Sequence, residues 1–452
     1  GMKTLLMEKF TVLGVLATVG LINWWEPLCN AEGKKLISGV SEEILRRTIR
    51  YSMHRLPAEW QTEGIWEQET DKRFVTHFSP TIMLLVLLDM LIEAGVAVRF
   101  DTLATYPETD GNRVVGISAE TISGTEYYPC RAVIDASGTC LVFDRAGAPC
   151  RNGENFMSFY SHITQFKEGQ TYNMLKIRGW HITGAGMTGK GQPEDYPLTS
   201  GTTSDEVTSY CIKGQTMLFD EVKQTDPLSQ EIIALPMMPQ YRMIRHIVGA
   251  YEMTMDDLYR PQTDSVGTCG YFGHTGYWFE IPYRAIYVPG YPNLFAAGRV
   301  ISAHGDAWDA TRVIPVAAET GEIAARAAAL SINSGVDAAH VDVPTLQGIL
   351  RESGFRIHFD DKLCSGADVT VISKAENMKS SALRGIPRRG KKWWSTAHCT
   401  VRADFGCARC PCGRRSSRAM AEHAHALPIS GRKPNDSRHS PCRPEMSGRG
   451  GI

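Results

Sequence analysis

The side chains best suited to chemistry lie in residues 293–330, NLFAAGRVISAHGDAWDATRVIPVAAETGEIAARAAAL. His304 stands here beside Asp306 and Asp309, and an imidazole can gain or lose a proton near pH 7. His304 is therefore our candidate for a catalytic acid or base. The alternative is that His304 only holds its loop. Arg312 is the second candidate, either as a contact to a bound ligand or as an anchor of the same loop.

Two elements must position this loop. Residues 293–297 are a short apolar run that predicts a buried strand, and it ends at Gly298, where the backbone must pass close to another group. From Pro315 onward the residues are good helix formers. Neither Val313 nor Ile314 can cap that helix, so its first N–H groups call for a ligand oxygen or water. A plain strand, loop and packing helix remain the alternative.

The length of 452 residues allows two domains with sizeable cores. The net charge of −1 hides an asymmetry, since residues 361–452 hold 18 Lys plus Arg against 7 Asp plus Glu, which leaves 30 against 42 for the rest. That final stretch has no hydrophobic period and is rich in Gly, Pro, Arg and Ser. We therefore expect residues 362–452 to be a basic, disordered tail.

The 12 cysteines show no framework spacing, which favours a reducing compartment, the cytoplasm. The start, GMKTLLMEK before an apolar run of 16 residues, resembles an export signal. The run is short for a membrane span, and no small-residue cleavage site follows it, so we expect no membrane contact. Cys407, Cys410 and Cys412, with His398 and Cys399, lack a second matched pair, and we predict no metal site.

The run AGR, then SAHGDAWDATRVIP and an Ala/Gly-rich helix, resembles the C-terminal flavin-binding segment of FAD-dependent oxidoreductases. The superfamily is the glutathione-reductase-like one with two dinucleotide-binding domains, and the most similar branch is heterodisulfide-reductase A-like. The resemblance covers roughly residues 3–360 and implies FAD as the cofactor. It places the helix start at Pro315 against the pyrimidine edge of the flavin, where the helix dipole favours the reduced ring. Gly298, Arg299 and Val313 are then cofactor contacts.

A short apolar strand near the N-terminus ends at Glu8 and Lys9. Glu8 stands where the family has an acidic residue that accepts hydrogen bonds from ribose hydroxyls. The family has about twenty more residues before this point, with a glycine-rich turn, so we expect an N-terminal truncation. The segment VLGVLATVGLINWW, with Gly14 and Gly20, resembles the family's glycine-rich stretch beside the flavin. Val15 stands where a second glycine is usual, which crowds the backbone.

Residues 102–128 read as three short alternating strands with a DGN turn, and they resemble the family's antiparallel crossover. Residues 131–136 return as an apolar strand. The sequence DASG stands at the place of the family's ATG-like sequence. Ala136, Ser137 and Gly138 are therefore expected to turn the chain beside the adenosine side of FAD.

Residues 151–283 change character, because aromatic residues, Met and Gly alternate with polar residues and no βα repeat is evident. We predict an inserted α+β substrate domain here. Arg242 and Arg245 lie three positions apart and could recognise a carboxylate, with a solvated basic face as the alternative. Tyr283 and Arg284 follow a strand that re-enters the FAD domain and are candidates to line the flavin and substrate site.

The predicted fold is α/β, a Rossmann-like FAD-binding domain made of residues 1–150 and 284–361 with a parallel sheet and an antiparallel meander crossover. The expected function is an FAD-dependent oxidoreductase that passes hydride or electrons between the flavin and an unidentified small-molecule substrate. The body has no CxxC, which argues against a disulfide reductase. The alternatives are an inactive flavoprotein remnant and a protein that binds nucleic acid through its tail, a partner that we do not expect.

Overall fold

The computed structural model describes residues 2–31, 33–61, 72–165, 177–274 and 276–359. All of them belong to the first of two compact units, Gly1–Pro387, and the second unit, Arg388–Ile452, lies outside the described residues. The predictions for the basic tail and its cysteine cluster also fall outside this part of the chain.

Two pairs of parallel strands lie in the α/β part of the fold. The pairs are β1 (Leu5–Met7) with β4 (Ala97–Arg99), and β8 (Val133–Asp135) with β16 (Leu294–Ala296). Since β8 and β16 are parallel neighbours, the residues that follow them meet at one edge. Gly138 and Gly298, far apart in sequence, are therefore brought to the same place.

The three-stranded meander is antiparallel, as the sequence predicts. Its strands are β5 (Leu103–Asp110), β6 (Arg113–Thr121) and β7 (Gly124–Pro129). The buried side chain of Asn293 fastens it to β16, because Nδ2 donates to Val114 O at 2.7 Å and to Arg131 O at 2.9 Å, while Val114 N donates back to Oδ1 at 3.0 Å.

Helices pack beside these strands. Their bounds are α1 (Gly39–Arg50), α2 (Pro80–Glu93), α3 (Leu141–Arg145), α5 (Gly305–Thr311), α6 (Ile314–Ser334) and α7 (Val343–Glu352). The sequence pattern favours Ser41 as the N-cap of α1, but the helix begins earlier, with Ser38 at the N-cap position and Gly39 at a left-handed φ of 58°. Ser41 Oγ instead donates to Pro315 O at 2.8 Å and joins α1 to α6.

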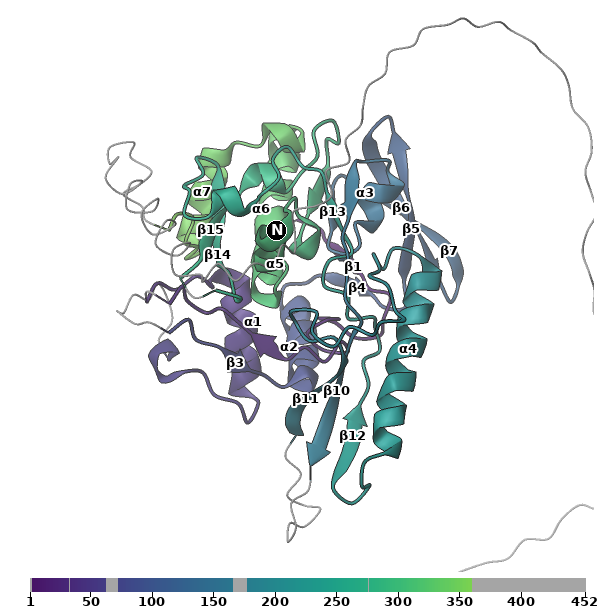
Figure 1. The fold of residues 1–452 in the computed structure, drawn as a ribbon. Coiled ribbons are helices and arrows are strands. Elements are labelled where there is room, and N and C mark those ends of the chain that lie inside the picture. Colours follow the sequence, from purple (N-terminus) through teal and green to yellow (C-terminus); the bar gives the residue numbers. More distant parts are fainter. Residues whose placement is uncertain (1, 32, 62–71, 166–176, 275, 360–452) are drawn as a thin grey trace, which may run out of the picture. The chain divides into compact units, whose positions relative to one another are not determined.

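A second sheet is antiparallel and has one long helix against it (Figure 1). Its strand order is β11 (Ile177–Gly184), β10 (Ser158–Gln165), β12 (Gln230–Ala234), and the helix is α4 (Ser204–Lys223). Thr203 and Glu206 form a capping box at the start of α4, which fixes where the helix begins. This arrangement agrees with the α+β character predicted for the region.

The remaining elements are short. They are β2 (Trp24–Trp25), β3 (Thr76–His77), β9 (Cys150–Asn152), β13 (Arg245–Ile247), β14 (Ser265–Gly270), β15 (Trp278–Pro282), η1 (Ala58–Trp60), η3 (Met255–Asp257), η4 (Tyr283–Ala285), η5 (Gly298–Val300) and η6 (Ala338–His340). The largest core gathers β14, β15, β16, α6 and α7 around residues such as Phe279, Phe295 and Ile323. Within the described ranges, no helix has the length and apolar character needed to cross a membrane.

Candidate functional site

The turn after β8 is organised by one buried carboxylate. Asp135 Oδ1 accepts hydrogen bonds from Ser137 N at 3.0 Å and Ser137 Oγ at 2.6 Å, and Oδ2 accepts from Val142 N at 2.8 Å. The same side chain thus shapes the turn and supplies an acceptor to the start of α3. Gly138 then takes a left-handed φ of 71°, which favours glycine. The predicted turn of Ala136, Ser137 and Gly138 is in place at the strand end.

Gly298 makes the close approach that the sequence predicts, and the neighbouring group is helix α6. Its φ is 75°, and its N–H donates to Thr320 Oγ1 at 2.9 Å. A Cβ at this position would lie 3.4 Å from Ala317 Cβ. A contact of that length is ordinary packing, so the left-handed φ is what favours glycine where the end of β16 meets the first turns of α6.

Helix α6 begins where the sequence predicts. Pro315 occupies its first turn, and Val313 at the N-cap position makes no side-chain cap. The side chain of Ile314 packs into a cluster with α1 and α2, and Pro315 is buried. The first turn is therefore covered on its apolar side, while its N–H groups have no side-chain acceptor from the cap.

Arg299 follows Gly298 directly and crosses to the other strand end. Its Nε donates to Gly138 O at 2.6 Å, and Nη1 donates to Tyr241 O at 2.7 Å. Burial, with the nearby charge of Arg312, lowers the pKa of this guanidinium to about 10. The guanidinium also fills the space beside Gly138, since a Cβ there would lie 2.7 Å from Arg299 Nε.

A second guanidinium lies nearby, at the end of α5. Arg312 is 12% exposed, and its Nε donates to Asp309 Oδ1 at 2.7 Å. Burial is the main cause that lowers its pKa, partly offset by Asp309 and reinforced by the charge of Arg242. Arg242 in turn donates from Nη2 to Tyr160 OH at 2.7 Å. We call Arg299, Arg312 and Arg242 the arginine cluster.

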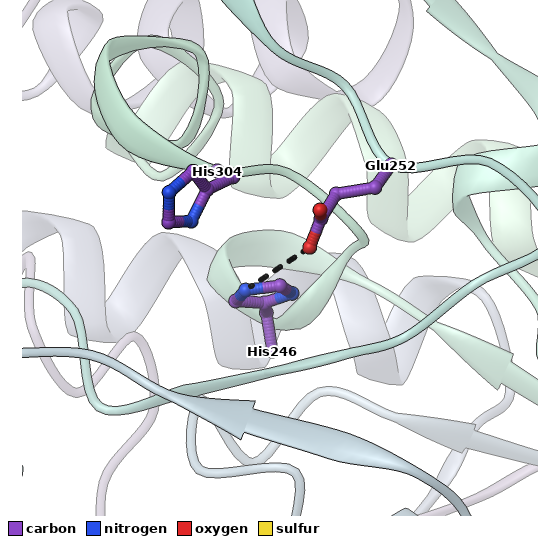
Figure 2. Close-up of side chains that lie close together, drawn as sticks. All are labelled: His246, Glu252 and His304. Carbon is purple, nitrogen blue, oxygen red and sulfur yellow. Dashed lines mark ion pairs between the residues drawn. The ribbon is translucent and has the colours of Figure 1, made fainter. Parts of the chain in front are cut away.

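His304 lies at the N-cap position of α5 and is exposed. Its ring stands near His246 and Glu252, and the nearest ligand atoms of the three side chains all lie within 4.8 Å of one another (Figure 2). The sequence singled out His304 alone. His246 and Glu252 were missed because they belong to a distant segment and form no recognisable motif with His304.

The N-terminal candidates lie at the end of β1 and in the loop after it. Glu8 is partly buried, its Oε1 accepts from Phe10 N at 2.9 Å, and burial raises its pKa. Lys9 is exposed, with Nζ 5.0 Å from the Phe10 ring. Gly14 has φ 80°, and Val15, where the family has glycine, has φ 22°. That left-handed value strains a β-branched residue, which the sequence did not predict.

The second sheet holds the loop that contains Gly20. Gln240 Nε2 donates to Gly20 O at 2.7 Å and to Tyr160 O at 3.1 Å. Trp180 Nε1 donates to Leu21 O at 2.9 Å, and His162 Nε2 lies 3.0 Å from the same oxygen. We call this set of contacts the loop clamp, because it fixes residues 20–21 against β10 and β11.

Three predicted substrate residues have other partners. Arg245 is paired with Asp144 and donates from Nε to Asn152 Oδ1 at 2.9 Å. Tyr283 is buried, and its OH donates to Ala338 O at 2.6 Å. Arg284 is 41% exposed and donates from Nε to Asp264 Oδ2 at 2.9 Å. Of the four residues predicted to contact the substrate, only Arg242 belongs to the arginine cluster.

Two thiols also lie close together, near the end of β8. Cys140 and Cys150 share a hydrogen bond, which lowers the pKa of Cys150, while burial raises the pKa of Cys140. The absence of CxxC in the body concealed this pair, since Cys140 lies just before α3 and Cys150 begins β9.

The chain was also compared with known proteins. Residues 1–198 and 161–350 match the model of a family described as FAD dependent oxidoreductase. A search of curated proteins found no match.

Several solved structures share a distant likeness. The p-nitrophenol 4-monooxygenase from Pseudomonas putida DLL-E4 is 11% identical with a TM-score of 0.40, over 85% of this chain and 88% of that one. A geranylgeranyl bacteriochlorophyll reductase-like protein from Thermoplasma acidophilum is 12% identical with a TM-score of 0.36, over 84% and 91%. An anhydrotetracycline hydroxylase from Streptomyces rimosus is 11% identical with a TM-score of 0.36, over 85% and 67%. At this distance they carry no argument about substrate.

Proposed function

The chain belongs to the FAD dependent oxidoreductase family, and we propose that it passes a hydride or electrons between its FAD and a small anionic substrate at the strand ends around Gly298. FAD, when bound, supplies the redox chemistry, and the protein supplies position and charge. We further propose membership of the glutathione-reductase-like superfamily, in its heterodisulfide-reductase A-like branch, because the run from Ser302 to Pro315 resembles that branch. The surplus of guanidinium charge at this edge is the observation that carries the proposal.

The residues at the strand ends fit a dinucleotide cofactor. Gly138 and Gly298 have left-handed backbones at neighbouring strand ends, so a ligand can approach the main chain there once the Arg299 guanidinium moves away from Gly138. The uncapped start of α6 favours negative charge. Glu8 offers a carboxylate at the end of β1 for ribose hydroxyls. The further proposed contacts are Lys9, Gly14, Gly20, Ala136, Ser137, Arg299, Val313 and Pro315.

The arginine cluster favours an anion. Burial is the main cause that lowers the pKa of both Arg299 and Arg312, and the charge of Arg312 lowers that of Arg299 further, as the charge of Arg242 does that of Arg312. Asp309 pairs with Arg312 and offsets one of these charges. A carboxylate brought between Arg312 and Arg242 would be bound by charge-assisted hydrogen bonds and would relieve the repulsion. We therefore propose a carboxylate-bearing substrate, with Tyr160 orienting Arg242.

His304 is our proposed acid or base. It is exposed at the start of α5, in the segment between strand β16 and helix α6. From there its imidazole can exchange the proton that accompanies electron transfer. We also keep the proposed division of the chain, with residues 1–150 and 284–361 for FAD and 151–283 for substrate, because Tyr160 and Arg242 reach the cofactor edge from the latter.

A spectroscopic titration tests this function. Purified holoprotein is expected to show flavin absorbance, and benzoate, as a probe carboxylate, is expected to shift that spectrum. Arg242→Gln should weaken benzoate binding by about 10-fold or more, the value of one charged hydrogen bond, with FAD content unchanged. Arg326→Gln is the control, since this exposed residue pairs with Glu322 on α6 away from the cluster. Absence of flavin after reconstitution, or an unchanged benzoate affinity in Arg242→Gln, contradicts the proposal.

A further inference from the structure

His246, Glu252 and His304 form a compact group of ligand atoms outside the arginine cluster. His246 comes from β13, Glu252 from the segment that follows it, and His304 from the start of α5. Figure 2 shows the side chains of the three residues close together. The backbone holds them there, because His304 N donates to Met253 O at 2.8 Å.

The hydrogen bond of His246 fixes its tautomer. Its Nδ1 lies 2.8 Å from the carbonyl oxygen of Ile247. A carbonyl can only accept, so Nδ1 carries a hydrogen and, in the neutral ring, Nε2 keeps a lone pair. The side chain is 0% exposed, and Nε2 has no hydrogen-bond partner among the described residues.

This free nitrogen faces a carboxylate. His246 Nε2 lies 3.8 Å from Glu252 Oε1, which is too long for a hydrogen bond. Two hydrogen-bond acceptors therefore face each other, one on the buried ring of His246 and one on Glu252, whose side chain is 24% exposed. A cation between them would take the lone pair of Nε2 and a lone pair of Oε1, which also accepts a hydrogen bond from Arg151 Nη1 at 2.7 Å.

We propose that His246 Nε2, Glu252 and His304 bind one divalent transition-metal ion. Two imidazoles and one carboxylate suit Mn²⁺, Fe²⁺, Co²⁺ or Zn²⁺ and leave coordination positions for water. Ligand atoms about 2.1 Å from a metal lie about 3.4 Å apart in a tetrahedral site, close to the 3.8 Å observed between His246 and Glu252. The ligand atom of the exposed His304 lies within 4.8 Å of the other two, so its ring would move closer to complete the site.

Neighbouring groups support these ligands. The Ile247 carbonyl orients the His246 ring, whose face is fixed by Trp308 with ring centroids 4.5 Å apart. Arg151 Nη1 donates to both oxygens of Glu252, at 2.7 and 2.9 Å, and holds that carboxylate in place. Such partners of the ligands are typical of metal sites. Metal binding would also occupy one nitrogen of His304, so that this nitrogen could not exchange a proton with the substrate.

Binding of Mn²⁺ to the holoprotein tests the site. Mn²⁺ is chosen because carboxylate and imidazole bind it better than the chain's many thiols do, and the free ion is counted by its EPR signal. We expect one Mn²⁺ per chain, displaced by Zn²⁺. Glu252→Gln and His304→Gln should each weaken binding by about 10-fold or more. His340→Gln, at an exposed histidine of η6, should leave it unchanged.

Two outcomes overturn the site. One is the absence of Mn²⁺ and Zn²⁺ binding by the holoprotein, and the other is binding that keeps the same affinity in both Glu252→Gln and His304→Gln. Because His304 is exposed, its variant tests the site even if changes at the buried His246 prevent folding. Flavin absorbance measured on the same samples reports FAD binding separately, so failure of the metal site is distinguishable from failure of the proposed oxidoreductase function.

Discussion

Arg299 donates a hydrogen bond from Nε to the carbonyl oxygen of Gly138 at 2.6 Å, and this contact links the ends of two parallel strands. The guanidinium lies in the space that any side chain at position 138 would need. If FAD binds at the Gly138 backbone, the Arg299 side chain must first move away from it. The anionic cofactor would then offer the guanidinium a new partner.

Gly138→Ala should destabilise the protein more than Gly111→Ala. Both glycines have left-handed φ values, 71° and 58°, so both variants carry a conformational penalty of about 1 kcal/mol. A Cβ at position 138 also collides with Arg299, whereas nothing lies within 4 Å of one at position 111. Urea unfolding measures the two free energies. Equal losses of unfolding free energy in the two variants would show that the Arg299 side chain moves aside at no cost.

Glu319 should make the protein less stable as the pH rises. This carboxyl on α6 is fully buried, neither oxygen has a hydrogen-bond partner within the described residues, and burial raises its pKa well above 4.5. Above pH 4.5 the unfolded chain releases this proton while the folded chain keeps it. The free energy of unfolding then falls by about 1.4 kcal/mol per pH unit until the folded pKa is reached.

Substituting Glu319→Leu should remove that slope and raise the stability at neutral pH. The exposed Glu352→Gln on α7 is the matched control and should keep the slope. Unfolding free energies between pH 5 and 8 decide the matter, and a slope that survives in Glu319→Leu assigns it to other groups.

Val15→Gly should increase FAD retention. Val15 has φ 22°, where a β-branched side chain is strained by about 1–3 kcal/mol, and glycine is the family's usual residue in this stretch. Removing the side chain relieves that strain and opens the backbone beside the proposed flavin site. Val19→Gly removes a similar side chain from a residue without a left-handed φ, so it should not help. The ratio of flavin to protein absorbance after dialysis compares the variants, and equal retention in both would separate Val15 from cofactor binding.

The sequence predicted those features that depend on neighbours along the chain. The helix from Ile314, the turn at Gly138 and the close approach at Gly298 each follow from a few consecutive residues. The sequence did not reveal which groups the long side chains contact. Arg245 and Arg284 looked available for a substrate, but Asp144 and Asp264, distant in sequence, hold them.

The same limit explains what the sequence missed. Arg299 and Arg312 were recognised one by one, but their mutual effect, with Arg242, needs the fold to place three charges together. His246 and Glu252 carry no motif. Their importance comes from a nitrogen whose direction is set by the Ile247 carbonyl.

The loop clamp has a consequence for motion. Gln240 and Trp180 bind the main-chain oxygens of Gly20 and Leu21, so the loop beside the proposed flavin site cannot shift without disturbing the edge of β10 and β11. Amide protons of residues 17–22 and of β10 should therefore exchange with deuterium as one cooperative unit.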